Sequence, residues 1–200
     1  MESFSLKSNN RFLQILGILV LVAIVGWCTF TRCFQNNGIF DYDAARDKVA
    51  VRTMFHEDYK FLYFGNPDEI SVNDFDVDFM LDQATSSQYS ARHDLVMKVM
   101  REEGRTVGFL AYHPRSPYWW HMLFIVVDKK YRRKGYAAQL VQYFIDDVIK
   151  RGAIKISTFT RLKNTRARAL YEDKFKFKAT VLNDEHYQGN YVDLVLYPKK

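Results

Sequence analysis

The chain has 200 residues, of which 48% are hydrophobic and 16% are aromatic, enough for one domain of average size with its own core. Its formal net charge of +6 comes from 29 basic and 23 acidic side chains. This modest excess suits an anionic ligand or an anionic membrane face. The basic residues are spread along the chain and match no nucleic-acid-binding motif, so we expect no nucleic-acid partner.

An apolar segment lies near the N-terminus, between a polar stretch at residues 1–11 and a linker at residues 31–38. The run from Phe12 to Phe30 carries no formal charge and is close to the roughly 20 residues that a membrane-crossing helix needs. A signal peptide has a shorter apolar core that ends in small residues, whereas Trp27 is bulky. We therefore predict a single transmembrane anchor at residues 12–30. A signal peptide and a buried helix are the alternatives.

The two cysteines, Cys28 and Cys33, both lie at the end of this apolar segment. They offer no disulfide framework and no zinc spacing, and the rest of the chain has no cysteine nucleophile. We therefore expect no metal site.

A single domain is expected at residues 39–200, since no repeat or Pro/Ser-rich gap interrupts it. A short strand at Ile39–Tyr42 precedes a helix at Asp43–Phe64, where apolar residues recur at helical spacing. Gly65–Asp68 ends that helix. A second helix is predicted at Phe75–Leu81.

Three strands follow in the middle of the chain. Asp94–Arg101 alternates apolar and polar residues, and the short turn Glu102–Arg105 predicts a hairpin with a strand at Thr106–Tyr112. His113–Pro117 is expected to be a loop. Tyr118–Val127 is a long apolar and aromatic run, typical of a central strand.

The C-terminal part continues the alternation of helices and strands. Ala137–Arg151 is expected to be a helix that ends at Gly152, and Ala153–Thr160 a strand. Asn164 is a suitable N-cap for a further helix. The last two strands are predicted at Phe177–Leu182 and Tyr191–Leu196. The order β-α-α-β-β-β-α-β-α-β-β indicates an α/β domain with antiparallel hairpins at one side.

A basic turn, Arg132-Arg133-Lys134-Gly135-Tyr136-Ala137, connects the central strand to the next helix. The first turn of a helix exposes main-chain N–H groups, which together with the helix dipole suit a phosphate group. Gly135 permits a tight turn, and the basic side chains add positive charge. The spacing suits a phosphate-binding turn, and a basic turn that only caps a core helix is the alternative.

This turn resembles the acetyl-CoA signature of the GNAT superfamily of N-acetyltransferases, Q/R-x-x-G-x-G/A after a strand. Arg132, Gly135 and Ala137 stand at its three defining positions, whereas Lys129 replaces a frequent proline. The resemblance covers about Ile39 to Leu196. It implies an α/β fold with the mixed central sheet of the GNAT acyltransferases, here preceded by one transmembrane helix.

A second GNAT motif, N-x-x-A-x-x-L-Y-E, matches the stretch from Asn164 to Glu172. The family usually continues with a glycine and a phenylalanine, but residues 173–177 contain no glycine. Either Phe175 takes the place of the glycine, or the exit from the helix is slightly longer.

The resemblance implies that acetyl-CoA is the co-substrate and that a primary amine of a small molecule, peptide or protein is the acceptor. Tyr171 would donate a proton to the leaving sulfur, and a core aromatic is the alternative role. The main chain at the end of the central strand would bind the pantetheine arm, and the basic turn would bind the pyrophosphate. The implied cofactor-binding residues are Ile125, Val127, Arg132, Arg133, Lys134, Gly135, Tyr136, Ala137 and Asn164.

The general base is not evident, because the strand Tyr118–Val127 holds no Asp or Glu. His121 is its only titratable candidate, with a plain strand histidine as the alternative. Glu102 and Asp128 are more distant candidates. Tyr118, Trp119 and Trp120 either line an acceptor pocket or belong to core and rim.

Four functions are therefore open at this stage. The first is an N-acetyltransferase, and the second is a transferase that uses a longer acyl-CoA. The third is a membrane-tethered CoA-binding scaffold without turnover, and the fourth is a secreted binding protein. An enzyme that needs cytosolic acetyl-CoA favours a domain on the cytoplasmic side of the membrane.

Overall fold

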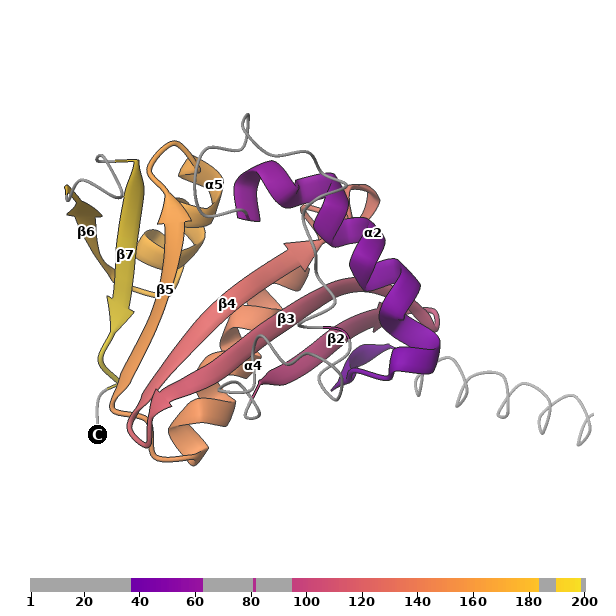
Figure 1. Ribbon diagram of the computed structural model, residues 1–200, viewed down its shortest axis with the longest axis horizontal. Coiled ribbons are helices and arrows are strands. Elements are labelled where there is room, and N and C mark those ends of the chain that lie inside the picture. Colours follow the sequence, from indigo (N-terminus) through magenta and orange to yellow (C-terminus); the bar gives the residue numbers. More distant parts are fainter. Residues whose placement is uncertain (1–36, 63–80, 82–94, 184–189, 199–200) are drawn as a thin grey trace, which may run out of the picture. The chain divides into compact units, whose positions relative to one another are not determined.

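The computed structural model describes residues 37–62, 81, 95–183 and 190–198 (Figure 1). The chain divides into two units, residues 1–38 with 102–105 and residues 39–101 with 106–200. In the smaller unit, Glu103 donates its main-chain N–H to Oδ1 of Asn37 at 2.5 Å. The larger unit contains both long helices of the domain.

A seven-stranded sheet organises this unit, in the order β1-β2-β3-β4-β5-β7-β6. Strand β4 lies in the middle, antiparallel to β3 and parallel to β5, and β5 and β6 both pair antiparallel with β7. The strands are β1 (Gly38–Asp41), β2 (Val96–Glu102), β3 (Arg105–Ser116), β4 (Trp119–Val127), β5 (Lys155–Arg161), β6 (Lys178–Leu182) and β7 (Tyr191–Leu196). The expectation of an α/β domain with a mixed sheet is thus confirmed.

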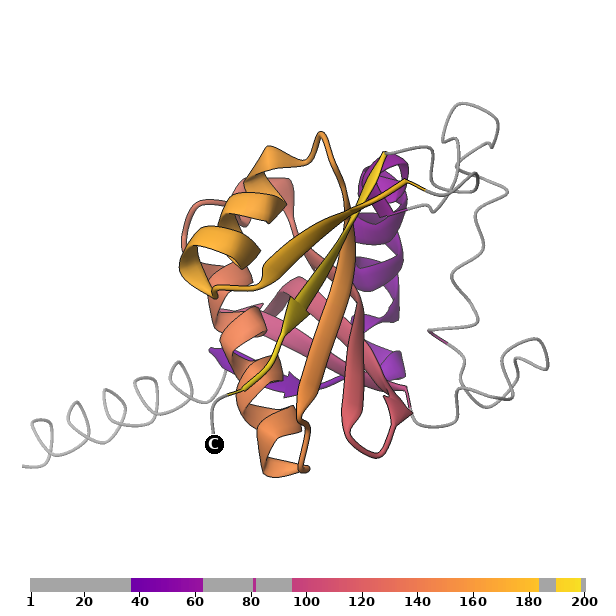
Figure 2. The ribbon, with the colours of Figure 1, turned by 90° about the vertical axis from the view of Figure 1, so that its left-hand side faces the viewer.

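Two long helices cover opposite faces of the sheet (Figures 1 and 2). Helix α2 (Ala44–Leu62) packs Val51 and Phe55 into one hydrophobic cluster. Helix α4 (Tyr136–Lys150) packs Leu140 and Phe144 into a second cluster on the other face. Because both faces of β4 are covered, its sequence is apolar apart from His121 rather than alternating.

Most of the predicted elements within the described residues are confirmed to within a few residues at each end. The transmembrane segment at residues 12–30 lies outside the described residues. So does the second helix at Phe75–Leu81, apart from Leu81, which is helical and buried. In the part of the chain that the structure describes, no helix is both long and apolar enough to cross a membrane.

The prediction of a loop at His113–Pro117 was wrong, because β3 continues to Ser116. Its pairing with β4 is irregular twice, between Ala111 and Tyr112 and between Pro114 and Ser116. A proline is tolerated in a strand at such an irregularity, where the ladder does not need its missing N–H.

A buried ion pair joins α2 to β2. Asp47 is fully buried and accepts hydrogen bonds from Arg101 at 2.7 Å, from the Thr106 hydroxyl at 2.6 Å and from the main-chain N–H of Asp43 at 2.9 Å. Burial alone would raise the pKa of Asp47, but these hydrogen bonds outweigh it and lower the pKa.

We expect Asp47→Ala to destabilise the fold by about 3–5 kcal/mol, because it leaves the Arg101 charge buried and unpaired. Denaturant unfolding measures this loss. The control is Asp41→Ala, which removes an ion pair whose carboxylate is 86% exposed and should cost less than about 1 kcal/mol.

The contribution of Asp47 is present above the unfolded pKa near 3.8 and is lost as the pH falls through the lowered folded pKa. The difference between Asp47→Ala and the unmodified protein should therefore shrink in acid. A difference that stays constant down to the lowest accessible pH would contradict this account.

Candidate active site

The parallel strands β4 and β5 separate halfway along their length. Their pairing runs from Trp119 opposite Lys155 to Met122 opposite Thr158 and then stops, although both strands continue. Leu123 is an extra residue in β4, because Tyr112 pairs with Met122 and Ala111 pairs with Phe124. Such a bulge increases the local twist and bends the strand. The main chain of β4 beyond Met122 is therefore open on its β5 side (Figure 1).

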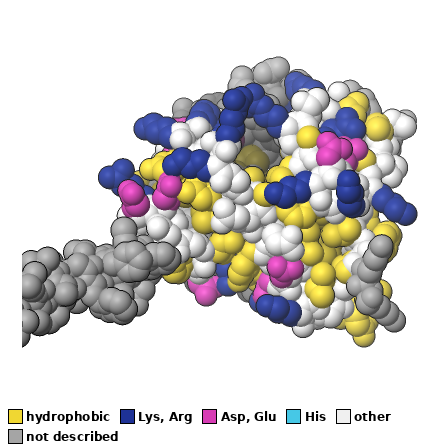
Figure 3. Space-filling model, turned by 180° about the vertical axis from the view of Figure 1, so that it is seen from behind, with side chains coloured by type: hydrophobic (Ala, Val, Ile, Leu, Met, Phe, Trp, Pro, Cys, Tyr) yellow, Lys and Arg dark blue, Asp and Glu magenta, His cyan; other side chains and the backbone are white. Residues whose placement is uncertain are grey.

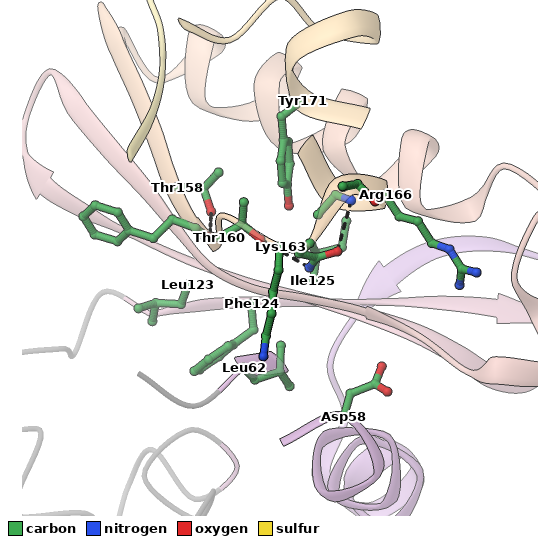
Figure 4. A pocket seen from close by; sticks show the side chains of 14 residues that line it. Asp58, Leu62, Leu123, Phe124, Ile125, Thr158, Thr160, Lys163, Arg166 and Tyr171 are labelled. Carbon is green, nitrogen blue, oxygen red and sulfur yellow. Dashed lines mark hydrogen bonds between the residues drawn. The ribbon is translucent and has the colours of Figure 1, made fainter. Parts of the chain in front are cut away.

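A cavity of about 340 Å³ lies at this opening (Figure 4). The Tyr171 ring points into it from one side, and Asp58 and Leu62 of α2 lie on the opposite side. The remaining walls come from the ends of β4 and β5 and from the segment that follows β5: Leu123, Phe124, Ile125, Thr158, Phe159, Thr160, Lys163, Asn164, Thr165, Arg166 and Ala167.

The main chain of Ile125 and Val127 points toward this opening. The Asp128 N–H bonds to the carbonyl of Val107 on β3 at 3.0 Å. Because the N–H and C=O groups of successive residues point to opposite sides of a strand, those of Ile125 and Val127 point away from β3. The Val127 carbonyl is occupied, since it accepts from Nε of Arg132 at 2.9 Å.

The basic turn places main-chain donors at the start of α4. Gly135 is the N-cap with φ of 84°, in the left-handed region that favours glycine, and Arg133 also has a positive φ of 66°. The first hydrogen bond of the helix joins Gln139 N to Gly135 O at 3.1 Å. The N–H groups of Tyr136 and Ala137 precede it and therefore have no helical acceptor.

Basic side chains surround this region, and from behind the molecule Lys and Arg side chains gather around a hollow (Figure 3). Among the described residues, Arg133, Lys163 and Arg166 form no ion pair or hydrogen bond through their side chains, and the latter two line the cavity. Lys134 lies over the Tyr131 ring at 4.9 Å.

The side chain of Arg132, by contrast, is held by hydrogen bonds. Its guanidinium bonds to the Val127 carbonyl and to the carboxylate of Asp58, a half-buried ion pair that ties the loop to α2. Burial raises the pKa of Asp58, although the charge of Arg132 opposes the shift. The Arg132 side chain is thus positioned to fix the loop, and its assignment to cofactor binding stays a prediction.

We expect Arg132→Ala to lower the free energy of unfolding by about 1–3 kcal/mol, because two charge-assisted hydrogen bonds are lost. Arg132→Lys should not restore it, since one ammonium group does not reproduce the planar fork that reaches both acceptors. Arg133→Ala is the matched control and should leave stability unchanged. Denaturant unfolding of the three variants decides, and equal losses at both arginines would contradict this role.

Asn164 acts as the predicted N-cap of α5 (Thr165–Arg168). Its Oδ1 accepts from Ala167 N at 3.3 Å, and its Nδ2 donates to the Thr160 hydroxyl at 3.3 Å. The side chain lines the cavity with both polar atoms engaged, so it shapes the wall that faces the opening.

Tyr171 is 3% exposed, and its hydroxyl has no hydrogen-bond partner among the described residues. Burial raises the pKa of the Tyr171 phenol well above its usual value. The hydroxyl therefore keeps its proton at neutral and moderately alkaline pH and can donate it within the cavity.

A π-helical turn, η3 (Ala169–Lys174), carries Tyr171, with Phe175 N bonded to Leu170 O at 3.3 Å. One inserted residue in a helix produces such a turn. Lys176 follows with φ of 60°, the left-handed conformation that a glycine usually supplies. The exit is thus one residue longer, and Lys176 rather than Phe175 takes the place of the missing glycine.

His121 does not line the cavity. It is 3% exposed, its Nδ1 lies 2.9 Å from the Ser157 hydroxyl, and its ring centroid is 5.0 Å from that of Phe159, which does line the cavity. Asp128 caps the 3₁₀ turn η2 (Lys129–Tyr131), where it accepts from Lys130 N.

The three aromatic residues at the start of the central strand are also absent from the cavity lining. Trp120 packs in the cluster beneath α4, Tyr118 is 62% exposed, and the Trp119 indole N–H donates to Ser157 at 2.7 Å. Sequence reasoning missed the cavity residues Asp58, Lys163 and Arg166. Lys163 and Arg166 flank the recognised Asn164, whereas nothing in the sequence connected Asp58 to the site. Among the described residues, no group of three or more His, Cys, Asp or Glu side chains could hold a metal ion.

Comparisons with known proteins assign the family. The model of the acetyltransferase (GNAT) family matches residues 49–177, so the chain belongs to this family. It is an acyltransferase, and enzymes of this family use acetyl-CoA as co-substrate. No curated protein matches the sequence significantly.

Solved structures share the fold at low sequence identity. Ard1 from Thermoplasma volcanium matches with a TM-score of 0.61 and 18% identity, over 82% of this chain and 99% of that chain. The putative acetyltransferase yncA from Salmonella typhimurium, with its cofactor acetyl-CoA, matches with a TM-score of 0.60 and 18% identity, over 82% of this chain and 95% of that chain. The ribosomal-protein-S18-alanine N-acetyltransferase from Escherichia coli matches with a TM-score of 0.56 and 18% identity, over 80% of this chain and 90% of that chain.

Proposed function

We propose that this protein transfers an acetyl group from acetyl-CoA to a primary amine by direct attack of the amine, with Tyr171 as general acid. The observation that carries the proposal is the buried Tyr171 hydroxyl, which keeps its proton and has no partner among the described residues. It points into the cavity at the opening between β4 and β5.

The residues at this opening fit an elongated anionic thioester. The free edge of β4 at Ile125 offers main-chain groups for an amide-containing arm, as in the addition of a strand to a sheet. The N–H groups at Tyr136 and Ala137, with the φ of Gly135 and the charges of Arg133 and Lys134, suit a pyrophosphate. Asn164 lines the same cavity.

Acetyl-CoA supplies the acyl group as a thioester, whose carbonyl is the electrophile. Tyr171 holds a proton at Oη and donates it to the departing sulfur as the C–S bond breaks. Phe124 and Phe159 contribute apolar walls to the cavity, which limit access of water and protect the acyl group from hydrolysis. His121 of β4 is not among the residues that line the cavity, so it could interact with the amine only through a bridging water.

Thermal unfolding of the full chain in detergent, with acetyl-CoA and with longer acyl-CoAs, tests the co-substrate. A ligand at 100 times its dissociation constant adds about 2.7 kcal/mol, which raises the midpoint measurably. Release of free CoA thiol in the presence of a panel of primary amines then tests turnover. Binding of acetyl-CoA without amine-dependent thiol release across the panel would contradict the enzymatic proposal.

One observation favours a second candidate, a CoA-binding scaffold without turnover. Among the residues that line the cavity, Asp58 is the one carboxylate, and it is paired with Arg132. The same thiol assay separates the two functions. A transferase with a longer acyl donor would instead show its largest thermal shift with that donor.

We also propose that residues 12–30 form a single membrane anchor and that the domain faces the cytoplasm, where acetyl-CoA is available. The uncharged run from Phe12 to Phe30 supports the anchor. Retention in the membrane pellet after alkaline carbonate extraction is expected. Protection of the domain from protease added outside intact cells tests its side, and extraction into the supernatant would overturn the anchor.

A further inference from the structure

Three polar side chains on strands β4 and β5 form a hydrogen-bonded group, and one of them, His121, contacts the cavity-lining residue Phe159. Trp119 Nε1 is 2.7 Å from Oγ of Ser157, and His121 Nδ1 is 2.9 Å from the same oxygen. Ser157 is 1% exposed and lies opposite His121 in the parallel ladder. Because Ser157 and His121 are buried, their side-chain polar atoms depend on neighbouring groups rather than on bulk water.

The donors and acceptors of this group can be assigned by counting. An indole nitrogen only donates, so Oγ of Ser157 accepts from Trp119. Ser157 forms no other side-chain hydrogen bond among the described residues than the one to His121. Its hydroxyl proton thus has one available acceptor, Nδ1 of His121. If Nδ1 of His121 donated to Ser157 instead, the hydroxyl proton of Ser157 would be buried without an acceptor.

We infer that Ser157 is a positioning residue that holds neutral His121 as the tautomer with its proton on Nε2. The ring nitrogen that accepts a hydrogen bond carries no proton, so the other nitrogen must carry it. His121 then presents an N–H donor at Nε2 and no lone pair there.

A consequence for the reaction follows, and this step rests on the proposed function. A base removes the amine proton with a free lone pair, directly or through water. The only lone pair of neutral His121 is at Nδ1, where it is occupied by Ser157. Neutral His121 is therefore not the general base, and the amine loses its proton to another acceptor.

Nitrogen NMR of the full chain in detergent micelles, labelled with ¹⁵N at its five histidines, tests the tautomer. The spectra are recorded about two pH units above the reference histidine pKa of about 6.5. His121→Asn identifies the His121 signals by their loss. The expected result is a pyridine-type Nδ1 and a pyrrole-type Nε2, and a pyrrole-type Nδ1 would overturn the inference.

Two variants test the role of Ser157. In Ser157→Ala, the Nδ1 signal should shift because the hydroxyl no longer donates to it. Trp119→Phe is the matched control: it removes a hydrogen bond to the same oxygen but keeps the hydroxyl, so Nδ1 should stay pyridine-type. An unshifted Nδ1 in Ser157→Ala, in a variant whose amide spectrum shows a folded domain, would overturn the inference. These signals do not depend on turnover, so failure of the proposed function is detected separately by the thiol assay.

Discussion

Tyr171→Phe is expected to lower turnover by about 100-fold or more while leaving the affinity for acetyl-CoA nearly unchanged. General acid catalysis contributes about 10²–10⁴-fold, and phenylalanine removes the proton that Tyr171 would donate. The ring itself stays, and it packs against Phe177 at a centroid distance of 5.6 Å. The hydroxyl has no partner among the described residues, so its loss should not destabilise the fold.

The pH dependence of turnover provides an independent check on Tyr171. Burial raises the pKa of the phenol above 10, its ordinary value, so the acid form persists as the pH rises. The rate at saturating substrate should therefore show no decline caused by Tyr171 up to about pH 10. Tyr197→Phe is the control, because that side chain is 59% exposed and away from the cavity lining. Equal rates in Tyr171→Phe and Tyr197→Phe would remove Tyr171 from the mechanism.

The sequence could predict those parts of the site that depend on local main-chain geometry. Gly135 lies in the expected tight turn before α4, and Asn164 is the expected N-cap of α5. Each is determined by a few neighbouring residues: a left-handed φ favours glycine, and an N-cap favours a short polar side chain.

Features that depend on long-range pairing could not be predicted. Asp58 reaches Arg132 across 74 positions of sequence, and only the packing of α2 on the sheet brings them together. The bulge at Leu123 opens β4 toward the cavity, yet the apolar run Trp119–Val127 has the same composition with or without it. The exit after Tyr171 was recognised as unusual from the missing glycine. The π-helical turn there could be seen only in the structure, because a lysine seldom adopts a φ of 60° and the sequence gives no sign of it.

The sequence also could not show toward which face of the sheet a side chain points. Trp119 and Trp120 are neighbours in a run of aromatics, but a strand turns them to opposite faces. One donates to Ser157 beside His121, and the other is buried beneath α4. The aromatic run therefore predicted a strand, but it did not show which tryptophan lies beside Ser157 and which lies beneath α4.

Gly135→Glu is expected to abolish measurable binding of acetyl-CoA. A Cβ at Gly135 would meet no atom of the chain within 4 Å, so the side chain can be accommodated, and it adds a negative charge to the turn that is proposed to bind the pyrophosphate. Two like charges about 5 Å apart at an effective dielectric constant of about 20 repel by about 3 kcal/mol, which is more than a 100-fold loss of affinity. The left-handed φ of 84° adds a backbone strain of about 1–2 kcal/mol.

Gly152→Glu separates the loss of the binding site from that strain. Gly152 lies just beyond the other end of α4, has φ of 87°, and a Cβ there also meets nothing within 4 Å. Both variants should therefore lose similar stability in denaturant, while calorimetric titration detects acetyl-CoA binding only in Gly152→Glu. Retained affinity in Gly135→Glu would show that the basic turn merely caps the helix. A parallel loss in both variants would show that strain in α4, rather than the charge at its N-terminus, controls binding.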